Sequence, residues 1–273
     1  MAFDNQPSTD GEAPYDDWAD LYDKVYAYLD YDIGFYVQQA EASGGPVLEL
    51  GCGTGRISLA LAEAGFDVTG VDISPRMVAQ ASAKAKSLSL VSQATFVVGD
   101  MADHDASGSG TEGAFAMVCF PFRSFQSMIE VGDQREALEN AAAQLQDGGM
   151  LVLDTFFPDM EQLGNRHDEA IPFHIRDVEQ ADGSNIIVWG QNLWDSVSQV
   201  NAARLIIEEL DATGRSVARH FRDFDLRYTF RYEMEHLLEL SGFTLEAVYG
   251  DFDGGDVTEE SDDLVWVARK TAS

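Results

Sequence analysis

The stretch Val47-Leu48-Glu49-Leu50-Gly51-Cys52-Gly53-Thr54-Gly55-Arg56 decides the fold. It is an apolar run that ends in three alternating glycines, and a helix-like segment, Ile57 to Ala64, follows it. A second apolar run, Val68 to Val71, then ends in Asp72. A strand, a glycine turn, a helix and a second strand with an acid at its tip are typical of a doubly wound sheet. Such a sheet places a nucleoside-containing cofactor across the carboxyl ends of its strands.

The spacing of the glycines separates two classes of cofactor. A dinucleotide fold favours G-x-G-x-x-G, in which the pyrophosphate rests on the N-terminus of the following helix. Here Gly51, Gly53 and Gly55 alternate, Arg56 stands in place of the third motif glycine, and Glu49 lies just upstream. The spacing therefore favours a cofactor without a pyrophosphate. A dinucleotide site and a plain packing turn remain as alternatives.

Charge is the unusual part of the composition. The 273 residues include 48 Asp and Glu against 17 Lys and Arg, which gives a formal net charge of -31. The acids are spread along the chain and are not gathered into a tail. A dispersed acidic surface is typical of proteins that work in high salt, where a Debye length of about 3 Å at 1 M screens self-repulsion. We therefore expect a halophilic source, with an ordinary acidic protein as the alternative.

The same composition argues against several functional classes. There is no basic stripe for a phosphate backbone, so we expect no nucleic-acid partner. There is no run of about 18 apolar residues, so we expect no membrane span. The N-terminus lacks the basic region of a signal peptide, which indicates a cytoplasmic protein. Cys52 and Cys119 are expected to be reduced packing residues, and no Cys/His spacing predicts a metal site.

The remaining pattern predicts an α/β core made of alternating strands and helices. Residues 1–14 look disordered, and residues 15–42 have helical spacing. The helix expected over 133–146 is expected to end at a glycine cap, Gly148-Gly149. Strand–helix alternation with short connections predicts a doubly wound, mostly parallel sheet. The expected strands are 46–50, 67–72, 94–98, 114–119 and 149–155, and the expected helices are 55–64, 75–88 and 133–146.

An antiparallel β-rich block interrupts this core. Turn signals at Asp182-Gly183 and Thr213-Gly214 separate runs that predict hairpin strands. A helix over 231–241 and two final strands then close the core, which makes seven strands in all. The expected organisation is an N-terminal tail and helical lid (1–44), a core (45–156 and 230–273) and an inserted antiparallel β subdomain (157–229). The expected hairpin strands are 186–193, 200–210 and 217–228, and the final strands are 243–249 and 264–268.

The E-x-G-x-G-x-G pattern that begins at Glu49 resembles motif I of the class I S-adenosylmethionine-dependent methyltransferases. The resemblance covers about 45–156 and 230–270, and it implies S-adenosylmethionine as the cofactor. Asp72 resembles the acid that binds both ribose hydroxyls in that family, since a carboxylate offers two acceptors to a cis-diol. Asp100 and Met101, which follow the third strand, resemble the pair that contacts the adenine. Met77 would lie against the adenine or the ribose.

Other residues are candidates for the remaining contacts. Arg56 could pair with the carboxylate of the cofactor, and Tyr22 resembles a tyrosine that caps the cofactor in small-molecule members of the family. Electron-rich rings near a sulfonium favour it by cation–π contact. For the arginines and the histidine, a surface role is the alternative in each case. The candidate rings are Tyr15, Tyr22, Phe120 and Trp189, and the candidate acceptor-side residues are Arg123, Tyr15, His174, Arg176 and Arg231.

The resemblance implies methyl transfer to a small polar acceptor at nitrogen or oxygen, by in-line displacement. The position of the insertion resembles the small-molecule N-methyltransferase branch. The sequence shows no nucleophile–base pair, and alignment in a dry pocket can suffice for such a transfer. The alternatives are an NAD-dependent oxidoreductase and a non-catalytic cofactor-binding or interaction protein on the same fold. A homodimer through the strand edges of the insertion is a further hypothesis.

Overall fold

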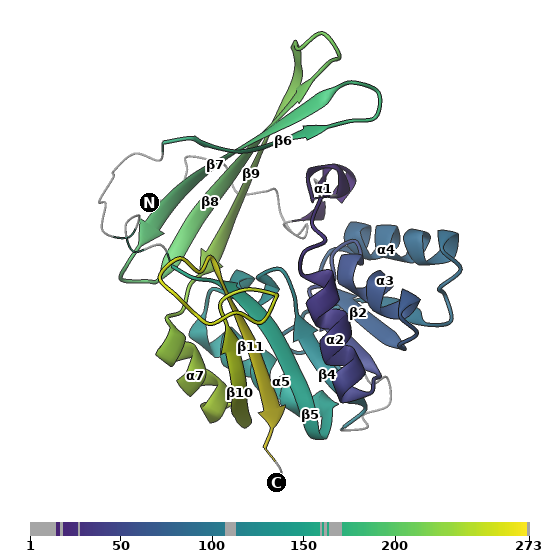
Figure 1. Cartoon of the computed structure of the whole chain (residues 1–273), viewed down its shortest axis with the longest axis vertical. Coiled ribbons are helices and arrows are strands. Elements are labelled where there is room, and N and C mark those ends of the chain that lie inside the picture. Colours follow the sequence, from purple (N-terminus) through teal and green to yellow (C-terminus); the bar gives the residue numbers. More distant parts are fainter. Residues whose placement is uncertain are drawn as a thin grey trace.

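A computed structural model describes residues 15–16, 19–26, 28–106, 113–158, 160, 163 and 171–271. They form a seven-stranded sheet flanked by helices and a separate four-stranded sheet (Figure 1). This confirms the predicted α/β class with an inserted antiparallel β unit. The predicted disorder of residues 1–14 lies outside the described residues. Within the described part of the chain, no helix has the length and apolar character needed to cross a membrane.

The strands of the large sheet follow the order β10-β11-β5-β4-β1-β2-β3. Four pairings are parallel: β1 with β2 and with β4, β2 with β3, and β4 with β5. The last strand, β11, runs antiparallel to both of its neighbours. The carboxyl ends of the five parallel strands therefore meet at one edge of the sheet. The bounds are β1 Val47–Leu50, β2 Val68–Asp72, β3 Ala94–Val98, β4 Phe115–Phe120, β5 Leu145–Phe156, β10 Phe243–Tyr249 and β11 Asp263–Lys270.

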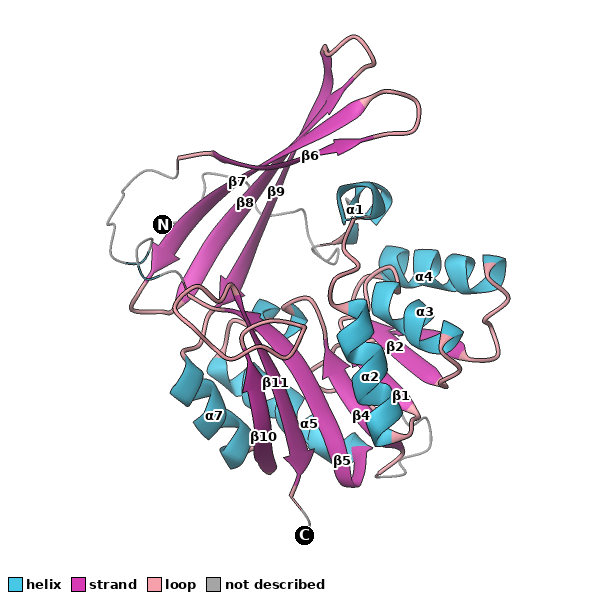
Figure 2. Cartoon of the chain, viewed as in Figure 1, coloured by secondary structure: helices cyan, strands magenta, loops and turns pink. Residues whose placement is uncertain are grey.

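Helices cover both faces of this sheet (Figure 2). The helices α5 (Val131–Gln144) and α7 (Arg231–Leu240) pack on one face. On the other face lie α2 (Ile33–Ser43), α3 (Arg56–Glu63) and α4 (Pro75–Ser87). Apolar side chains of the central strands are buried on both faces, as expected of parallel strands between two helical layers.

The helical spacing of residues 15–42 corresponds to two helices, α1 (Ala19–Tyr26) and α2, and Arg56 binds the carbonyl of Leu29 and the carboxylate of Asp32 in the connection between them. One local expectation is wrong. The expected glycine cap at Gly148-Gly149 is absent, since α5 ends at Gln144. Leu145 is already extended and pairs with Phe115, so the two glycines form an irregularity inside β5.

The inserted sheet has the order β6-β7-β8-β9, with every pairing antiparallel. Three of its strands match the expected segments. The fourth, β6, was not predicted because this edge strand is only weakly buried and shows no clear alternation. The bounds are β6 Phe173–Glu179, β7 Asn185–Asp195, β8 Val200–Leu210 and β9 Ser216–Arg227.

The helix α1 connects the two sheets. It lies between the inserted sheet and α4 (Figure 1). Its fully buried Val25 packs in a small apolar cluster with side chains from β7 and β8, namely Ile186, Val188, Leu205 and Ile207. On its polar side, Asp23 accepts a hydrogen bond from Thr54 in the glycine loop (2.6 Å) and pairs with Lys84 of α4 (2.6 Å). This helix therefore closes one side of the space above the strand ends.

Candidate cofactor and acceptor site

A cavity of about 560 Å³ lies at the carboxyl ends of β1, β2 and β4. Its walls also come from α1, α5 and β9, so it is shared between the core and the insertion. The volume is within the range of small-molecule sites. Eleven of the sequence-predicted residues line it: Tyr15, Tyr22, Glu49, Gly51, Gly53, Arg56, Asp72, Met77, Asp100, Met101 and Arg123.

The three glycines of the loop have the same backbone region but different surroundings. Gly51, Gly53 and Gly55 have φ values of +77°, +54° and +85°, a region that side chains disfavour. A Cβ on Gly51 would meet the Cβ of Ser124 at 2.6 Å, and one on Gly55 would meet Ala81 and Phe96 at 3.1 Å. A Cβ on Gly53 would meet no heavy atom within 4 Å. Gly51 and Gly55 thus serve packing, whereas Gly53 faces the open cavity.

Asp72 fixes the shape of this loop from the neighbouring strand. Its Oδ2 accepts the N–H of Gly53 at 2.8 Å, and its Oδ1 accepts the N–H of Ser74 at 2.9 Å. Burial raises the pKa of Asp72, and the two backbone amides oppose that rise. The side chain that caps α4 is Ser74, which accepts from the N–H of Met77. Asp72 therefore keeps acceptor capacity toward the cavity, because each carboxylate oxygen accepts more than one hydrogen bond.

Glu49 is a buried acid beneath the loop. Only 2% of it is exposed, and it accepts a hydrogen bond from the hydroxyl of Ser58. Burial raises the pKa of Glu49 to about 8, against the lowering effects of Ser58 and Arg56. The carboxyl is therefore mostly protonated at neutral pH in the free protein.

Arg56 lines the cavity but has a partner that the sequence did not reveal. Its guanidinium binds both carboxylate oxygens of Asp32, one of them at 2.7 Å, and donates to the carbonyl of Leu29 at 3.3 Å. It also lies 5.5 Å from the centroid of the Phe122 ring. The predicted contact with a cofactor carboxylate remains a prediction. It would have to use the N–H groups of Arg56 that are not bonded to Asp32.

Aromatic rings, those of Tyr15, Tyr22, Tyr26 and Phe122, form one wall of the cavity. Tyr22 and Tyr26 pack with ring centroids 4.7 Å apart, and Tyr26 meets Phe122 at 5.1 Å. Burial raises the pKa of Tyr15 to about 12 and that of Tyr22 well above its usual value, so both phenols stay neutral. Among the aromatic lining residues, Tyr26, Phe122 and Phe224 were not predicted, although the i,i+4 spacing of Tyr26 from Tyr22 is an available signal.

Several predicted residues lie elsewhere. Phe120 is fully buried and packs against Phe125 at 5.5 Å in the core beneath the sheet edge. It is Phe122, two residues later and beyond the end of the strand, that reaches the cavity. Gly55 lies behind the loop, in contact with α4 and β3.

The candidates from the insertion side do not line the cavity as the structure describes it. His174 is exposed, pairs with Asp177 at 3.0 Å and meets the ring of Trp189 edge-on, with ring centroids 5.3 Å apart. Arg176 lies over the ring of Tyr28 at 3.6 Å. Arg231 is exposed at the start of α7, next to Tyr232. Strand alternation places β9 residues, Phe224 and Leu226, at the cavity instead.

Arg123 lines the cavity at the turn that follows β4. Its guanidinium is paired with Asp263 of β11 at 2.6 Å (Nη2–Oδ1), so its predicted role as a free anchor for an acidic acceptor is weakened. Among the residues that the structure describes, no group of three or more His, Cys, Asp or Glu side chains has the arrangement of a metal site. The arrangement is thus a partly apolar chamber with several acids in its lining, among them Asp72 and Asp100, and with open space beside the backbone of Gly53.

Comparisons with known proteins agree on a class. Residues 47–149 match the family model described as a methyltransferase domain. YqeM of Bacillus subtilis carries a methyltransferase assignment with no acceptor stated; it is 25% identical over 272 residues, which cover 94% of this chain and 97% of that protein. The structure of the CcbJ methyltransferase from Streptomyces caelestis is 25% identical, with a TM-score of 0.78 and coverage of 96% and 99%.

A third comparison shows a likeness of fold to a cofactor complex. CalS10 from Micromonospora echinaspora is an amino pentose methyltransferase solved with S-adenosylmethionine bound. Its structure is 21% identical to this chain, with a TM-score of 0.62, and the match covers 96% of this chain and 93% of CalS10. The fold, the glycine loop and these matches support a class I S-adenosylmethionine-dependent methyltransferase. S-adenosylmethionine is the cofactor that they support, and they specify neither the acceptor nor whether nitrogen or oxygen is methylated.

Proposed function

We propose that this protein transfers a methyl group from S-adenosylmethionine to the nitrogen or oxygen of a small polar acceptor. The observation that carries the proposal is the open space beside Gly53 in the glycine loop, which we call the cradle. This residue is held in a left-handed conformation by Asp72, and its missing side chain leaves open space in the cavity. A cofactor that lies along the loop can use that space, and the residues around it fit a nucleoside with a sulfonium and an amino-acid end.

The residues of the cradle have distinct roles in this proposal. Asp72 accepts from the ribose hydroxyls, and Asp100 with Met101 holds the adenine, while Met77 gives an apolar contact. The aromatic wall of Tyr15 and Tyr22 lies near the positive charge and favours it by cation–π contact, worth roughly 0.5–2 kcal/mol. When bound, the cofactor supplies a methyl group that is already attached to a good leaving group.

The acceptor would enter between the aromatic wall and the inserted sheet. Phe224 and Leu226 of β9 close this side of the cavity and exclude water from it. An amine is the acceptor that we favour, since the fold neighbour CalS10 acts on an amino pentose and the acids near the cavity mouth, Asp133 and Glu136, would attract a cation. In this scheme residues 1–44 act as a lid and residues 157–229 as the acceptor wall.

Two further parts of the proposal concern the setting of the protein. We propose that it works at high salt, because the net charge of -31 is spread over the whole chain. A dinucleotide oxidoreductase is the second candidate, and the replacement of the third motif glycine by Arg56 argues against it. A non-catalytic binding role on the same fold is the third.

Calorimetric titration in molar KCl tests the cofactor. S-adenosylmethionine and S-adenosylhomocysteine should bind with micromolar affinity, and NAD should not bind. Asp72→Ala should weaken both by at least tenfold, whereas Asp67→Ala should not, because Asp67 is an exposed acid just before the same strand. Binding of NAD alone would overturn the proposal. Transfer of labelled methyl groups to a panel of aminosugars, amino acids and catechols then separates an enzyme from a binding protein.

A further inference from the structure

The turn that follows β4 is held in a costly backbone conformation. Phe122 and Arg123 are consecutive residues with φ values of +53° and +63°. Residues that carry a side chain disfavour this left-handed region. Both residues line the cavity. A pair of such residues persists only where the surroundings fix it, and such strain is concentrated at functional sites.

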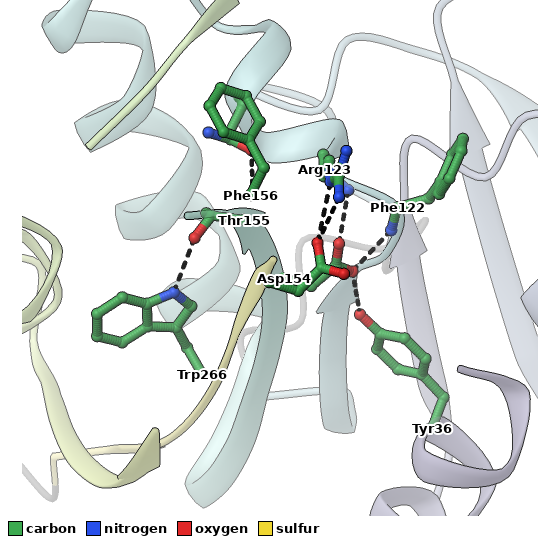
Figure 3. Close-up of polar contacts among 9 residues, drawn as sticks. Tyr36, Phe122, Arg123, Asp154, Thr155, Phe156 and Trp266 are labelled. Atoms are coloured by element: carbon green, nitrogen blue, oxygen red, sulfur yellow. Dashed lines mark hydrogen bonds and ion pairs between the residues drawn. The ribbon is translucent and has the colours of Figure 1, made fainter. Parts of the chain in front are cut away.

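The group that fixes the turn is the carboxylate of Asp154. Its Oδ1 accepts the N–H of Phe122 at 2.7 Å, and its Oδ2 accepts the N–H of Arg123 at 2.9 Å (Figure 3). The hydroxyl of Tyr36, from α2, donates to the same Oδ1 at 2.6 Å. Asp154 lies near the end of β5, and only 2% of it is exposed. Each oxygen of the carboxylate thus holds one amide of the turn.

The ends of the turn are tied to the rest of the site. The side chain of Arg123 is held separately by Asp263, and its guanidinium lies 5.7 Å from the ring of Phe156. Ser124 donates to the carbonyl of Leu50 at 3.0 Å, and it occupies the space that a Cβ on Gly51 would need. The turn therefore contacts the glycine loop at one end and carries Phe122 against Tyr26 at the other.

Asp154 does not touch the cavity itself. It is absent from the cavity wall as the structure describes it, and its oxygens are turned toward the two amides and Tyr36. A direct role as the base for an acceptor amine therefore does not fit its position. What it can do is set the place of the Phe122 ring, which is part of the aromatic wall on the acceptor side.

We propose that Asp154 is a positioning residue for methyl transfer: by binding both amides of the Phe122–Arg123 turn it fixes the acceptor-side wall relative to the glycine loop. This inference rests on the proposed function, which supplies the reaction. Loss of Asp154 should loosen the turn and misplace the acceptor, while the cradle around Gly53 and Asp72 stays intact. If Asp154 had a purely structural role, its loss would instead weaken the use of the cofactor and of the acceptor to the same extent.

The test compares two variants of the same full-length chain. Asp154→Asn removes one acceptor for the turn amides, and Asp263→Asn releases only the side chain of Arg123, leaving both amides bonded. Hydrogen–deuterium exchange of a peptide that covers residues 120–126 should become at least tenfold faster in Asp154→Asn and stay near the wild-type rate in Asp263→Asn. The affinity for S-adenosylhomocysteine should change less than threefold in both.

Kinetics with the aminosugar panel give the second readout. Asp154→Asn should lower kcat/KM for the aminosugar at least tenfold, with the KM for S-adenosylmethionine within threefold of wild type. Unchanged exchange in residues 120–126, or equal losses for both substrates, would overturn the inference. Exchange is also measured in the free protein. If the wild-type protein binds no S-adenosylhomocysteine, the proposed function is wrong. If exchange is unchanged in Asp154→Asn, the proposal that Asp154 fixes the turn is wrong, whatever the function.

Discussion

Substitutions at two glycines, Gly53 and Gly65, can separate the effect of backbone strain from the effect of lost cofactor binding. Gly53 and Gly65 both have positive φ values, +54° and +99°, and a Cβ on either would meet no heavy atom within 4 Å. Gly65 follows α3 at an exposed position, whereas Gly53 faces the cavity. Alanine would therefore bring backbone strain at both positions but would occupy binding space at only one.

We expect Gly53→Ala and Gly65→Ala to lower the free energy of unfolding by similar amounts, about 1–2 kcal/mol each. Only Gly53→Ala should weaken S-adenosylhomocysteine binding, by tenfold or more, because its methyl group enters the cradle. Urea unfolding and calorimetry measure the two effects. Equal affinity in the two variants would show that the open side of the loop holds no cofactor.

At the residue scale, the sequence predicts those site residues whose place depends on local chain geometry. The alternating glycines, Glu49 and Asp72 lie at strand ends, and the strands could be located from their apolar runs. The pattern predicts Phe120 and not Phe122, because the end of β4 and the left-handed turn after it have no signature in the local sequence. Asp154 was missed because the amides that it binds lie 32 and 31 residues away in the chain.

At the element scale, α1 has two faces with different partners. Its apolar side contacts the inserted sheet through Val25, and its acidic side contacts α4 and the glycine loop through Asp20 and Asp23. Tyr22 and Tyr26 lie on the same helix and line the cavity, so the packing of α1 against the inserted sheet sets the positions of both rings.

Val25→Ala should loosen this helix by about 2 kcal/mol, from two methyl groups lost in a packed cluster. We expect faster hydrogen exchange in residues 19–26 and several-fold faster release of S-adenosylhomocysteine in stopped-flow experiments. Val91→Ala is the matched control, since Val91 is 64% exposed and belongs to neither sheet. Equal release rates in the two variants would mean that α1 does not retain the cofactor.

The elements themselves were largely predictable, because the parallel strands are continuous apolar runs separated by helices of clear period. Two features were not. One is the break between α1 and α2, where Arg56 binds Asp32, and the other is the edge strand β6, which has too little buried surface to impose alternation. Both depend on tertiary neighbours that a local pattern does not contain.

At the scale of the whole molecule, the excess of acid sets how stability should depend on salt. The 48 acids exceed the 17 basic residues, so most acids cannot have a cationic partner of their own. Several of the basic side chains are already paired within the structure, as in Arg204–Asp223 and Arg123–Asp263. Repulsion among the remaining acids opposes the compact state, and added salt should reduce it.

We expect the Tm to rise by roughly 10 °C or more when KCl is increased from 0.1 M to the molar range, where the Debye length falls from about 10 Å to about 3 Å. Differential scanning fluorimetry in KCl and NaCl measures this, and sorbitol at matched osmolality controls for exclusion of solute from the surface. A Tm that is the same at low and high salt would contradict the proposal of a protein adapted to high salt.

The left-handed turn at Phe122 and Arg123 also limits how this chain can diverge. Glycine, asparagine and aspartate are the residues that tolerate such a backbone, so few side chains can replace these two without a loss of stability. Phe224 and Leu226, by contrast, stand on an extended strand that accepts almost any side chain. Descendants of this protein that acquire new acceptors should therefore change first along β9, while the turn keeps its residues.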